Sequence, residues 1–194
     1  TVAVLEERIA ALEGGTAGLA ASSGHAAQML VFHTIMDPGA EFVSAHQLYG
    51  GSVNQFGQAF KKYDWHVKWA DATDPDSFKR AITENTRALF CESIANPGGI
   101  ITDLEALGRI AEDAGVPLIV DNTLATPYLI RPFEWGAHII VHSATKFLGG
   151  HGNSLGGLIT EAGTFDWSKS GKYTTMTEPS DSYHGLKFYE TFGD

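Results

Sequence analysis

A lysine with hydroxyl and glycine neighbours follows a short apolar segment in the second half of the chain. Residues 139–141 are β-branched and predict a buried strand that ends at Ser143. Lys146 comes just after it, beside Thr145 and before a stretch, 149–157, that contains five glycines. The residues around Lys146 are apolar or small, and no carboxylate lies nearby in the sequence to pair with it. Desolvation would therefore favour the neutral amine, which can form a Schiff base with an aldehyde. A surface lysine beside a glycine-rich turn is the alternative interpretation.

An aspartate ends another apolar run upstream of this lysine. Residues 116–121 read VPLIVD and predict a second buried strand with Asp121 at its carboxyl end. In open α/β sheets ligands bind outside the carboxyl ends of the strands, so we expect Asp121 and Lys146 to face the same crevice. A lysine that holds an aldehyde and an acid that keeps a pyridine nitrogen protonated are what pyridoxal phosphate chemistry requires. The pair therefore indicates a candidate site for that cofactor.

A turn of small residues opens a predicted helix near the N-terminus. Ser22, Ser23, Gly24 and His25 come directly before a helical run. Free backbone N–H groups at a helix start lie at the positive end of the helix dipole and suit a phosphate. Serine is also a common helix cap, so these residues alone leave both interpretations open.

Two further loop residues could contact a planar ligand. Tyr49 is followed by Gly50 and Gly51, which would let its ring lie flat against such a ligand. Asn96 lies in an Asn-Pro turn just after a predicted strand, 87–92, and so at the carboxyl edge of the sheet. A loop aromatic and a structural turn are the respective alternatives.

The order of the predicted elements indicates an α/β fold. An amphipathic helix with its apolar face in the core is predicted by the spacing of Val2, Leu5, Ile9 and Leu12. Thr102 matches a capping box that would start another helix. Strands and helices then alternate, which predicts right-handed βαβ units and a mostly parallel sheet with flanking helices, in one domain spanning 1–194.

Composition limits the classes of protein to consider. With 194 residues and 43% hydrophobic content the chain can bury one sizeable core. A net charge of −10 without a basic cluster argues against nucleic-acid and anionic-membrane partners. The lone cysteine, Cys91, suits a reducing compartment such as the cytoplasm and is expected to be a buried core residue. No apolar stretch is long enough to cross a bilayer, and no signal peptide is visible.

Other kinds of site have less support from the sequence. The Gly-Lys pair at 171–172 lacks the flanking residues of a Walker phosphate loop. No HExxH or CxxC spacing occurs, so no metal site is expected. The absence of a G-x-S-x-G elbow argues against a serine hydrolase.

Several segments, taken in order, resemble one enzyme family. They are ASSGHAAQ (21–28), QLYGGS (47–52), ESIANPGG (92–99) and DNTLATPYLIRPFEWGAHIIVHSATKFLGGHGNSLGG (121–157). Together they are similar to the cofactor-site motifs of the Cys/Met-metabolism pyridoxal phosphate enzymes, which implies the large cofactor domain of the aspartate-aminotransferase-like (type I) fold. Within that family, residues 163–188 are most similar to O-acetylhomoserine sulfhydrylases. The resemblance covers essentially the whole chain.

This resemblance implies a role for each candidate residue. Lys146 would carry the cofactor and act as the catalytic base, and Asp121 would hold the pyridine nitrogen. Tyr49 would stack on the ring, with its hydroxyl near the reacting carbon, as a second catalytic residue. Asn96 would hydrogen bond to the phenolic oxygen of the cofactor.

The resemblance also implies how the phosphate would be held. The backbone amides of Gly24 and His25 would bind it, and Ser143 and Thr145 would supply hydroxyl groups. This chain has His25 where many members have methionine. The change should matter little if the contact is made through the backbone.

An activity follows from the same resemblance. A transferase of this kind replaces the acetate of O-acetylhomoserine by sulfide or methanethiol, which gives homocysteine or methionine. A cystathionine γ-synthase or a cystathionine or methionine lyase would share the cofactor residues, and an inactive cofactor-binding fragment is a further alternative. Members also carry an N-terminal arm and a C-terminal domain that we do not find in 1–194, so a truncated domain is expected. Assembly as a homodimer or homotetramer is implied as well.

Overall fold

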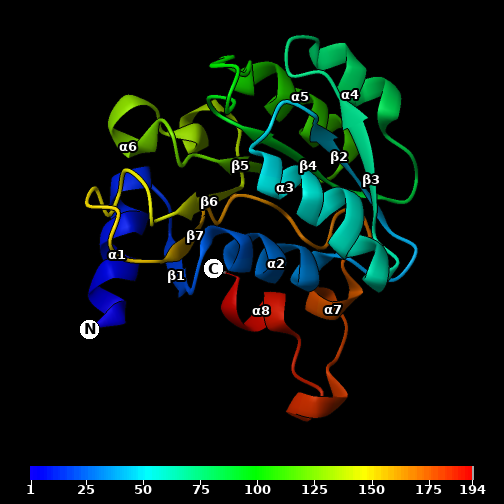
Figure 1. Cartoon of the computed structure of the whole chain (residues 1–194). Coiled ribbons are helices and arrows are strands. Elements are labelled where there is room, and N and C mark those ends of the chain that lie inside the picture. Colours follow the sequence, from blue (N-terminus) through cyan, green and yellow to red (C-terminus); the bar gives the residue numbers. More distant parts are fainter. Residues whose placement is uncertain (194) are drawn as a thin grey trace.

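The chain folds around one seven-stranded sheet (Figure 1). The computed structural model describes residues 1–193. The strand order is β1-β7-β6-β5-β4-β2-β3, and only β7 runs antiparallel to its neighbours, β1 and β6. The predicted mostly parallel α/β sheet is therefore confirmed. The strands are β1 (Ala17–Ala21), β2 (Glu41–Ala45), β3 (His66–Ala70), β4 (Thr86–Glu92), β5 (Leu118–Asp121), β6 (Ile139–Ser143) and β7 (Gly157–Glu161).

Helices of very different lengths connect these strands. None of those in residues 1–193 is both long and apolar enough to cross a membrane. The helical segments are α1 (Val2–Glu13), α2 (Gly24–Ile35), α3 (Gly50–Asn54), η1 (Gln55–Ala59), η2 (Phe60–Tyr63), α4 (Pro75–Ala81), α5 (Leu104–Ala114), α6 (Thr126–Leu129), η3 (Pro132–Trp135), α7 (Thr174–Thr177), η4 (Asp181–Tyr183) and α8 (Phe188–Phe192).

Side-chain alternation along β6 separates two helical layers. Gly24 at the start of α2 approaches Ser143, whereas Glu13 at the end of α1 hydrogen bonds to the preceding residue, His142. Because consecutive strand residues point to opposite faces, α2 and α1 lie on opposite sides of the sheet. The segment α3–η1 packs on the same side of the sheet as α2. Helices α4 and α5 lie on the same side as α1, where α5 contacts η3.

Aromatic side chains fill the space between α2 and the sheet. Phe32 of α2 packs against Phe42 of β2 and Phe56 of η1, with ring centroids 4.3 and 5.3 Å apart. Phe90 of β4 completes this cluster, and all four rings are buried. Burying one such ring stabilises a fold by about 1.5–3 kcal/mol. The cluster therefore holds α2 firmly against the sheet, which fixes its N-terminal end beside β6.

The helix cap expected at Thr102 is wrong. Asp103 is the N-cap of α5, and its side chain accepts the N–H of Ala106 at 2.9 Å. Thr102 is buried instead, and its hydroxyl donates to the carbonyl oxygen of Glu92 at 2.6 Å. A short carboxylate one residue later satisfies the free amides of the helix, so Thr102 is available to tie the loop to β4.

Helix α1 buries a narrower face than its sequence predicts. Ile9 is buried as expected, together with Glu13, but Val2, Leu5 and Leu12 are exposed. The expectation that all four apolar residues belong to the core is therefore wrong. The physical reason is that α1 packs on β1 and β7 at one edge of the sheet, so only a narrow side of the helix, with Ile9, Ala10 and Glu13, faces the sheet.

The C-terminal segment returns to the opposite end of the strands. Lys172 Nζ donates to the carbonyl oxygen of Thr86 at 2.9 Å, and the hydroxyl of Tyr173 donates to that of Arg87 at 2.8 Å. These bonds tie residues 172–173 to the start of β4, far from its carboxyl end. Helices α7 and α8 then lie beside α2 (Figure 1).

Cys91 lies in β4 and is fully buried. Burial raises the pKa of its thiol far above the usual range, and Glu92 and Asp121 raise it further by charge repulsion. A thiol held in its neutral form is a poor nucleophile. The interpretation of Cys91 as a core residue is confirmed.

Candidate cofactor-binding site

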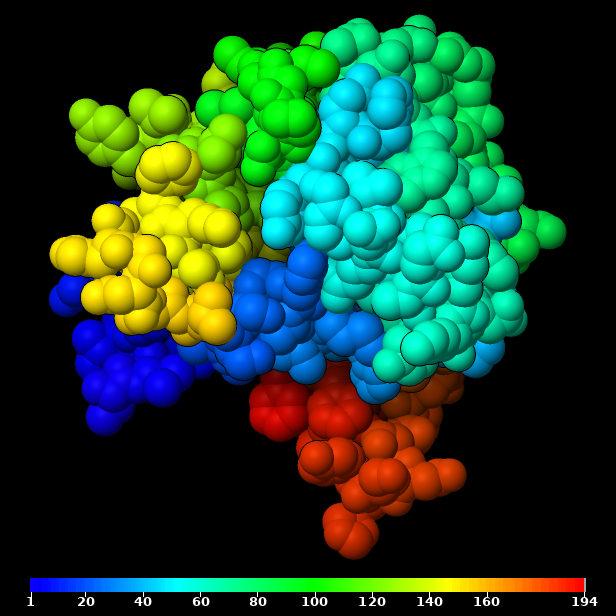
Figure 2. Space-filling model, viewed as in Figure 1, coloured from blue at the N-terminus to red at the C-terminus, as the bar shows by residue number. Residues whose placement is uncertain are grey.

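A cavity of about 580 Å³ opens at the carboxyl ends of the parallel strands. Its walls come from the start of α2, the loop before α3, the ends of β4, β5 and β6, and the loop between β6 and β7. In Figure 2 this last loop, in yellow, faces the blue and cyan segments. The volume is within the range of about 300–1,000 Å³ typical of small-molecule sites. All predicted site residues line it, namely Gly24, His25, Tyr49, Asn96, Asp121, Ser143, Thr145 and Lys146.

Asp121 is held at the end of β5 by two donors. Gln28 of α2 donates to its Oδ2 at 3.2 Å, and the N–H of Thr123 donates to its Oδ1 at 3.0 Å. Gln28 is buried and also donates to Ser52 Oγ at 3.1 Å. The carboxylate is thus oriented from two sides while it still lines the cavity. Sequence reasoning did not find Gln28, because its contact with Asp121 depends on how α2 packs.

Lys146 lies in the turn after β6. Its N–H donates to the carbonyl oxygen of Ser143 at 3.1 Å, and its own carbonyl accepts the N–H of Gly150 at 2.8 Å. The side chain is exposed, so the desolvation expected from its neighbours is not found. Within residues 1–193 its amine has no protein partner, which leaves it available to a ligand in the cavity.

The start of α2 meets the end of β6 at a close approach. A Cβ on Gly24 would lie 2.8 Å from the Cβ of Ser143, so a side chain at this position would push the helix away. Ser23 Oγ accepts the N–H of Ala26 at 3.1 Å. Because the first amides of a helix have no partner within it, Gly24 and His25 keep N–H groups that could bind a phosphate.

Two hydroxyl residues, one at the end of β6 and one just after it, line the cavity. The N–H of Ser143 donates to Thr123 Oγ1 at 2.8 Å, which links the ends of β5 and β6. Thr145 Oγ1 accepts the N–H of Gly156 at 3.1 Å, which closes the base of the loop between β6 and β7. Both residues are half-buried, and the Thr145 hydroxyl is held by the backbone of Gly156.

Tyr49 and His25 lie side by side at the mouth of the cavity. Their rings are 5.9 Å apart at an interplanar angle of 27°. A Cβ on Gly51 would collide with both rings, so this glycine provides the room in which they lie. Tyr49 is 49% exposed, which leaves much of its ring free to contact a ligand.

Glu92 is a residue of this cavity that sequence reasoning missed. Its carboxylate accepts the backbone N–H of Tyr49 at 2.7 Å and that of Asn96 at 2.8 Å. Burial raises its pKa to about 7; the charge of Asp121 raises it as well, while the two N–H groups lower it. The sequence does contain a signal, since Glu92 ends β4 at the position that pairs with Asp121 in β5.

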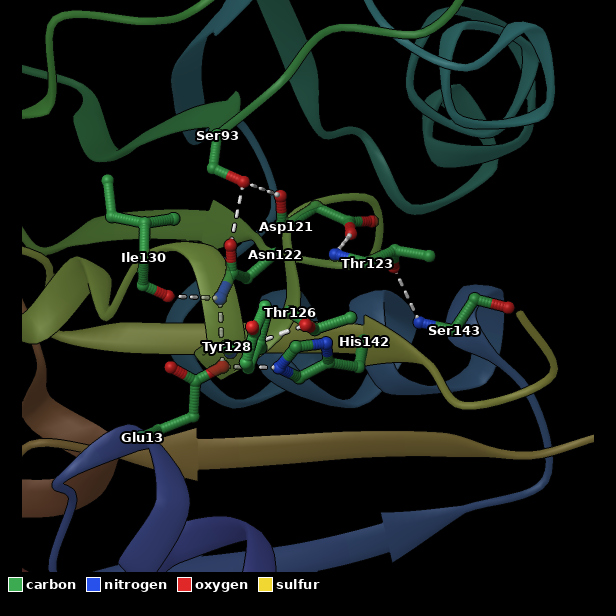
Figure 3. A network of polar contacts seen from close by, with 10 residues as sticks. All are labelled: Glu13, Ser93, Asp121, Asn122, Thr123, Thr126, Tyr128, Ile130, His142 and Ser143. Atoms are coloured by element: carbon green, nitrogen blue, oxygen red, sulfur yellow. Dashed lines mark hydrogen bonds and ion pairs between the residues drawn. The ribbon is translucent and has the colours of Figure 1, made fainter. Parts of the chain in front are cut away.

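A second polar cluster occupies the opposite face of the same strands (Figure 3). His142 Nε2 lies 2.6 Å from Glu13 Oε1, and Asn122 Nδ2 donates to the same oxygen at 3.0 Å. Ser93 Oγ donates to Asn122 Oδ1 at 2.7 Å. All four side chains are buried. This cluster ties the end of α1 to β5 and β6 directly behind the cavity.

A larger cavity, of about 770 Å³, lies between β1, β7, α2 and the C-terminal helices. Its lining is mainly apolar and includes Leu19, Val31, Ile139 and Phe188. It contains none of the predicted site residues. Within residues 1–193 no three His, Cys, Asp or Glu side chains are grouped so that they could hold a metal. The smaller cavity is therefore the candidate site.

Comparison with known families agrees with this geometry. The family model described as "Cys/Met metabolism PLP-dependent enzyme" matches residues 1–193. The chain belongs to this family. The expected cofactor of the family, pyridoxal phosphate, is thereby confirmed, as is the type I fold that the sequence motifs implied.

Members of the family with curated names are similar over the whole chain. The O-acetyl-L-homoserine sulfhydrylase of Leptospira meyeri is 48% identical over 193 residues, which are 100% of this chain and 43% of that protein. The O-acetyl-L-homoserine sulfhydrylase 1 of Thermus thermophilus is 47% identical over 196 residues, 100% of this chain and 46% of that protein. This chain therefore spans less than half the length of these relatives.

A solved member of the family has nearly the same fold. The structure of an O-acetylhomoserine (thiol)-lyase assigned in Campylobacter jejuni contains N'-pyridoxyl-lysine-5'-monophosphate. It superposes with a TM-score of 0.94 at 34% identity, over 97% of this chain and 47% of that chain. The metB structure of Corynebacterium glutamicum gives a TM-score of 0.80 at 37% identity, over 89% of this chain and 44% of that one.

The chemistry of the cavity fits the family cofactor. An amine without a protein partner, Lys146, can take an aldehyde, and an oriented carboxylate, Asp121, can take a ring nitrogen. Amides at the start of α2 suit a phosphate. Three kinds of group that the cofactor requires thus line one cavity of suitable size. Which atom of the cofactor each residue contacts stays a prediction.

Proposed function

We propose that this chain is the cofactor-binding part of a transferase that replaces the acetate of O-acetylhomoserine by sulfide or methanethiol. The products would be homocysteine or methionine, with acetate as the leaving group. The observation that carries this proposal is the 48% identity, over the whole chain, to a named O-acetyl-L-homoserine sulfhydrylase. The cavity supports it, because it offers the amine, carboxylate and amides that the cofactor requires.

The side chains at the ends of β5 and β6 would hold the cofactor from opposite ends. When bound, pyridoxal phosphate supplies an aldehyde for the substrate amine and a ring that accepts electrons from the substrate. The amine of Lys146 would hold it at the aldehyde carbon. Asp121, oriented by Gln28 and Thr123, would keep a proton on the ring nitrogen. Tyr49 would cover the ring, and Asn96 would donate to its phenolic oxygen.

The phosphate would lie at the start of α2. The amides of Gly24 and His25 would donate to it, and the hydroxyls of Ser143 and Thr145 would add two donors from the end of β6. A contact through the backbone explains why histidine can replace methionine at position 25. Gly24 supports this arrangement, since it lets the helix approach Ser143 closely.

Proton transfer on the substrate is assigned to Lys146 and Tyr49. The amine of Lys146, which no carboxylate of residues 1–193 pairs with, would accept protons from Cα and Cβ as acetate leaves Cγ, and would return them after the thiol has added. The hydroxyl of Tyr49 would lie near the reacting carbon as a second acid or base. Loss of acetate from Cγ then leaves the position to which the sulfur of the incoming thiol adds.

The assembly is proposed to be a homo-oligomer, a dimer or tetramer. Apolar side chains gather around the cavity mouth and are exposed, with Phe147 at 63% and Leu155 at 81%. Exposed apolar patches next to a site are typical of protein–protein contacts.

We also propose a cytoplasmic location, which the single reduced cysteine supports, and a single cofactor-binding domain over 1–194.

An assay of acetate release from O-acetylhomoserine tests the proposed activity. Release should depend on sulfide or methanethiol, and homocysteine or methionine should form in equal amount. Cysteine in place of sulfide serves as the comparison. Faster turnover with cysteine would favour a cystathionine γ-synthase, and cofactor binding without any release would favour an inactive fragment.

The role of Lys146 is tested separately. Reduction of the loaded protein with borohydride should add the cofactor mass to the peptide that contains Lys146. Lys146→Ala should abolish this addition and lower kcat by about 10³-fold. Lys62→Ala, a matched change of an exposed lysine away from the cavity, should leave both unchanged. Addition at another lysine would overturn the assignment.

A further inference from the structure

The carboxylate of Glu92 joins two loops that approach the cavity from different directions. Tyr49 precedes α3, and Asn96 follows β4; the two are 47 positions apart in the sequence. One carboxylate oxygen accepts the N–H of Tyr49 at 2.7 Å, and the other accepts the N–H of Asn96 at 2.8 Å. Both bonds are short for N–H···O hydrogen bonds. A single side chain therefore sets the distance between the two loops.

These two loops carry the residues proposed to contact the ring of the cofactor. Tyr49 would cover its face and Asn96 would contact its phenolic oxygen. Tyr49 is 49% exposed and its ring contacts His25 on one side, so its backbone must be held for the ring to keep its place. Glu92 supplies that restraint without using the side chain of either residue.

Burying a charged carboxylate at the position of Glu92 destabilises the fold. Only 6% of its surface is exposed, and the charge of Asp121 lies next to it on the paired strand. An uncompensated buried charge destabilises a fold by several kcal/mol. A simple helix cap would not need such a site, because serine or aspartate on the loop itself satisfies a free amide at less cost.

We propose that Glu92 is a positioning residue of the cofactor site, whose one carboxylate sets the places of Tyr49 and Asn96 through their backbone amides. This inference rests on the proposed function, in which those two residues contact pyridoxal phosphate. Glu92 itself does not react. Its effect on catalysis arises because a ring-contact residue displaced by about 1 Å can lower the rate by up to about 10²-fold.

The test compares Glu92→Gln with the wild-type protein loaded with pyridoxal phosphate. A glutamine has only one oxygen and would turn its NH2 group toward one of the amides, so one loop is released. We expect the dissociation constant of the cofactor to rise and kcat to fall, each by about tenfold or more, with a shift of the visible absorption band. The KM for the amino-acid substrate should change less than kcat.

Thr86→Val is the matched control. Thr86 is buried at the other end of β4, and its Oγ1 accepts the N–H of Thr83 at 2.9 Å, so the change also removes an acceptor from a backbone amide. It should lower stability without altering the absorption band or the cofactor affinity. If Glu92→Gln does not fold, Glu92→Asp keeps the carboxyl group but is too short to reach both amides, and should show the same loss.

The outcomes separate this inference from the proposed function. A wild-type protein that binds no pyridoxal phosphate would contradict the proposed function. A wild-type protein that binds it, together with Glu92 variants whose affinity, spectrum and kcat equal those of Thr86→Val, would overturn the positioning role alone.

Discussion

The two faces of β5 and β6 carry polar residues that immediately follow one another in the sequence but serve different purposes. Asp121 and Ser143 point to the α2 side and line the open cavity, whereas Asn122 and His142 point to the α1 side and are buried. Period-two alternation along a strand produces this division. Polar groups on the cavity face are left with capacity for a ligand, and those on the other face are paired mostly with one another.

Two buried glutamates show the same contrast. Glu92 accepts two backbone amides beside the cavity, while Glu13 contacts the side chains of His142 and Asn122. Burial alone therefore does not identify a functional carboxylate. Its hydrogen-bond partners do. Glu92 accepts from the loops that carry predicted site residues, on the face that we call the cavity face. Glu13 contacts His142 and Asn122 on the opposite face, which we call the scaffold face.

The largest effect on stability is expected from the scaffold face. Glu13→Ala leaves His142 and Asn122 without their shared acceptor in the buried interior, which should lower the free energy of unfolding by about 3–5 kcal/mol. Denaturant unfolding measures this loss. Glu7→Ala makes the same change at an exposed position of the same helix and should stay within about 0.5 kcal/mol of wild type. Equal effects of the two variants would break the contrast between the faces.

On the cavity face, the contribution of Glu92 to stability should depend on pH. The pKa of Glu92 is raised from 4.5 to about 7, so the folded state keeps its proton to higher pH than the unfolded state does. Its contribution to stability is therefore present below about pH 4.5 and lost as pH rises through about 7. At about 1.4 kcal/mol per pKa unit, the loss is about 3 kcal/mol.

Unfolding free energies of wild type and Glu92→Gln, measured at several pH values from 4.5 to 8, test this point. The stability of wild type relative to the variant should fall across this range. Parallel pH profiles for the two proteins would show that Glu92 titrates as an ordinary carboxyl group does.

The smallest effect is expected from Ser93, the residue after Glu92. Its Oγ donates to Asn122 Oδ1 at 2.7 Å on the scaffold face. Ser93→Ala should lower stability by about 1–2 kcal/mol, because a buried acceptor loses its donor, and should leave cofactor affinity unchanged. Ser154→Ala removes an exposed hydroxyl and should cost less than about 0.5 kcal/mol. A loss of cofactor affinity in Ser93→Ala would mean that the two faces are coupled.

The sequence predicted the cavity face better than the scaffold face. Asp121 and Lys146 could be placed in one crevice because each follows an apolar run, and the carboxyl ends of parallel strands meet at one edge of the sheet. Gly24 and Tyr49 were found from local turn chemistry and family motifs. These signals depend on neighbouring residues and on strand order, which periodicity can supply.

The scaffold face could not be predicted in this way. Glu13 and His142 are 129 positions apart, and their contact exists only because α1 packs under the edge of the sheet. The same packing leaves Leu5 and Leu12 exposed, against their helical pattern. Glu92 was missed although it ends a predicted strand, because its place beside Asp121 depends on the register in which β4 and β5 pair.

The strand order has a consequence for biosynthesis. β1, which leads directly into α2, is attached to the sheet only through β7, whose residues 157–161 come late in the sequence. A nascent chain on the ribosome that stops before this strand leaves β1 without its partner strand. Lys146 and the loop up to Leu155, which line the cavity, are also made late, so the complete cavity exists only after translation has passed this segment.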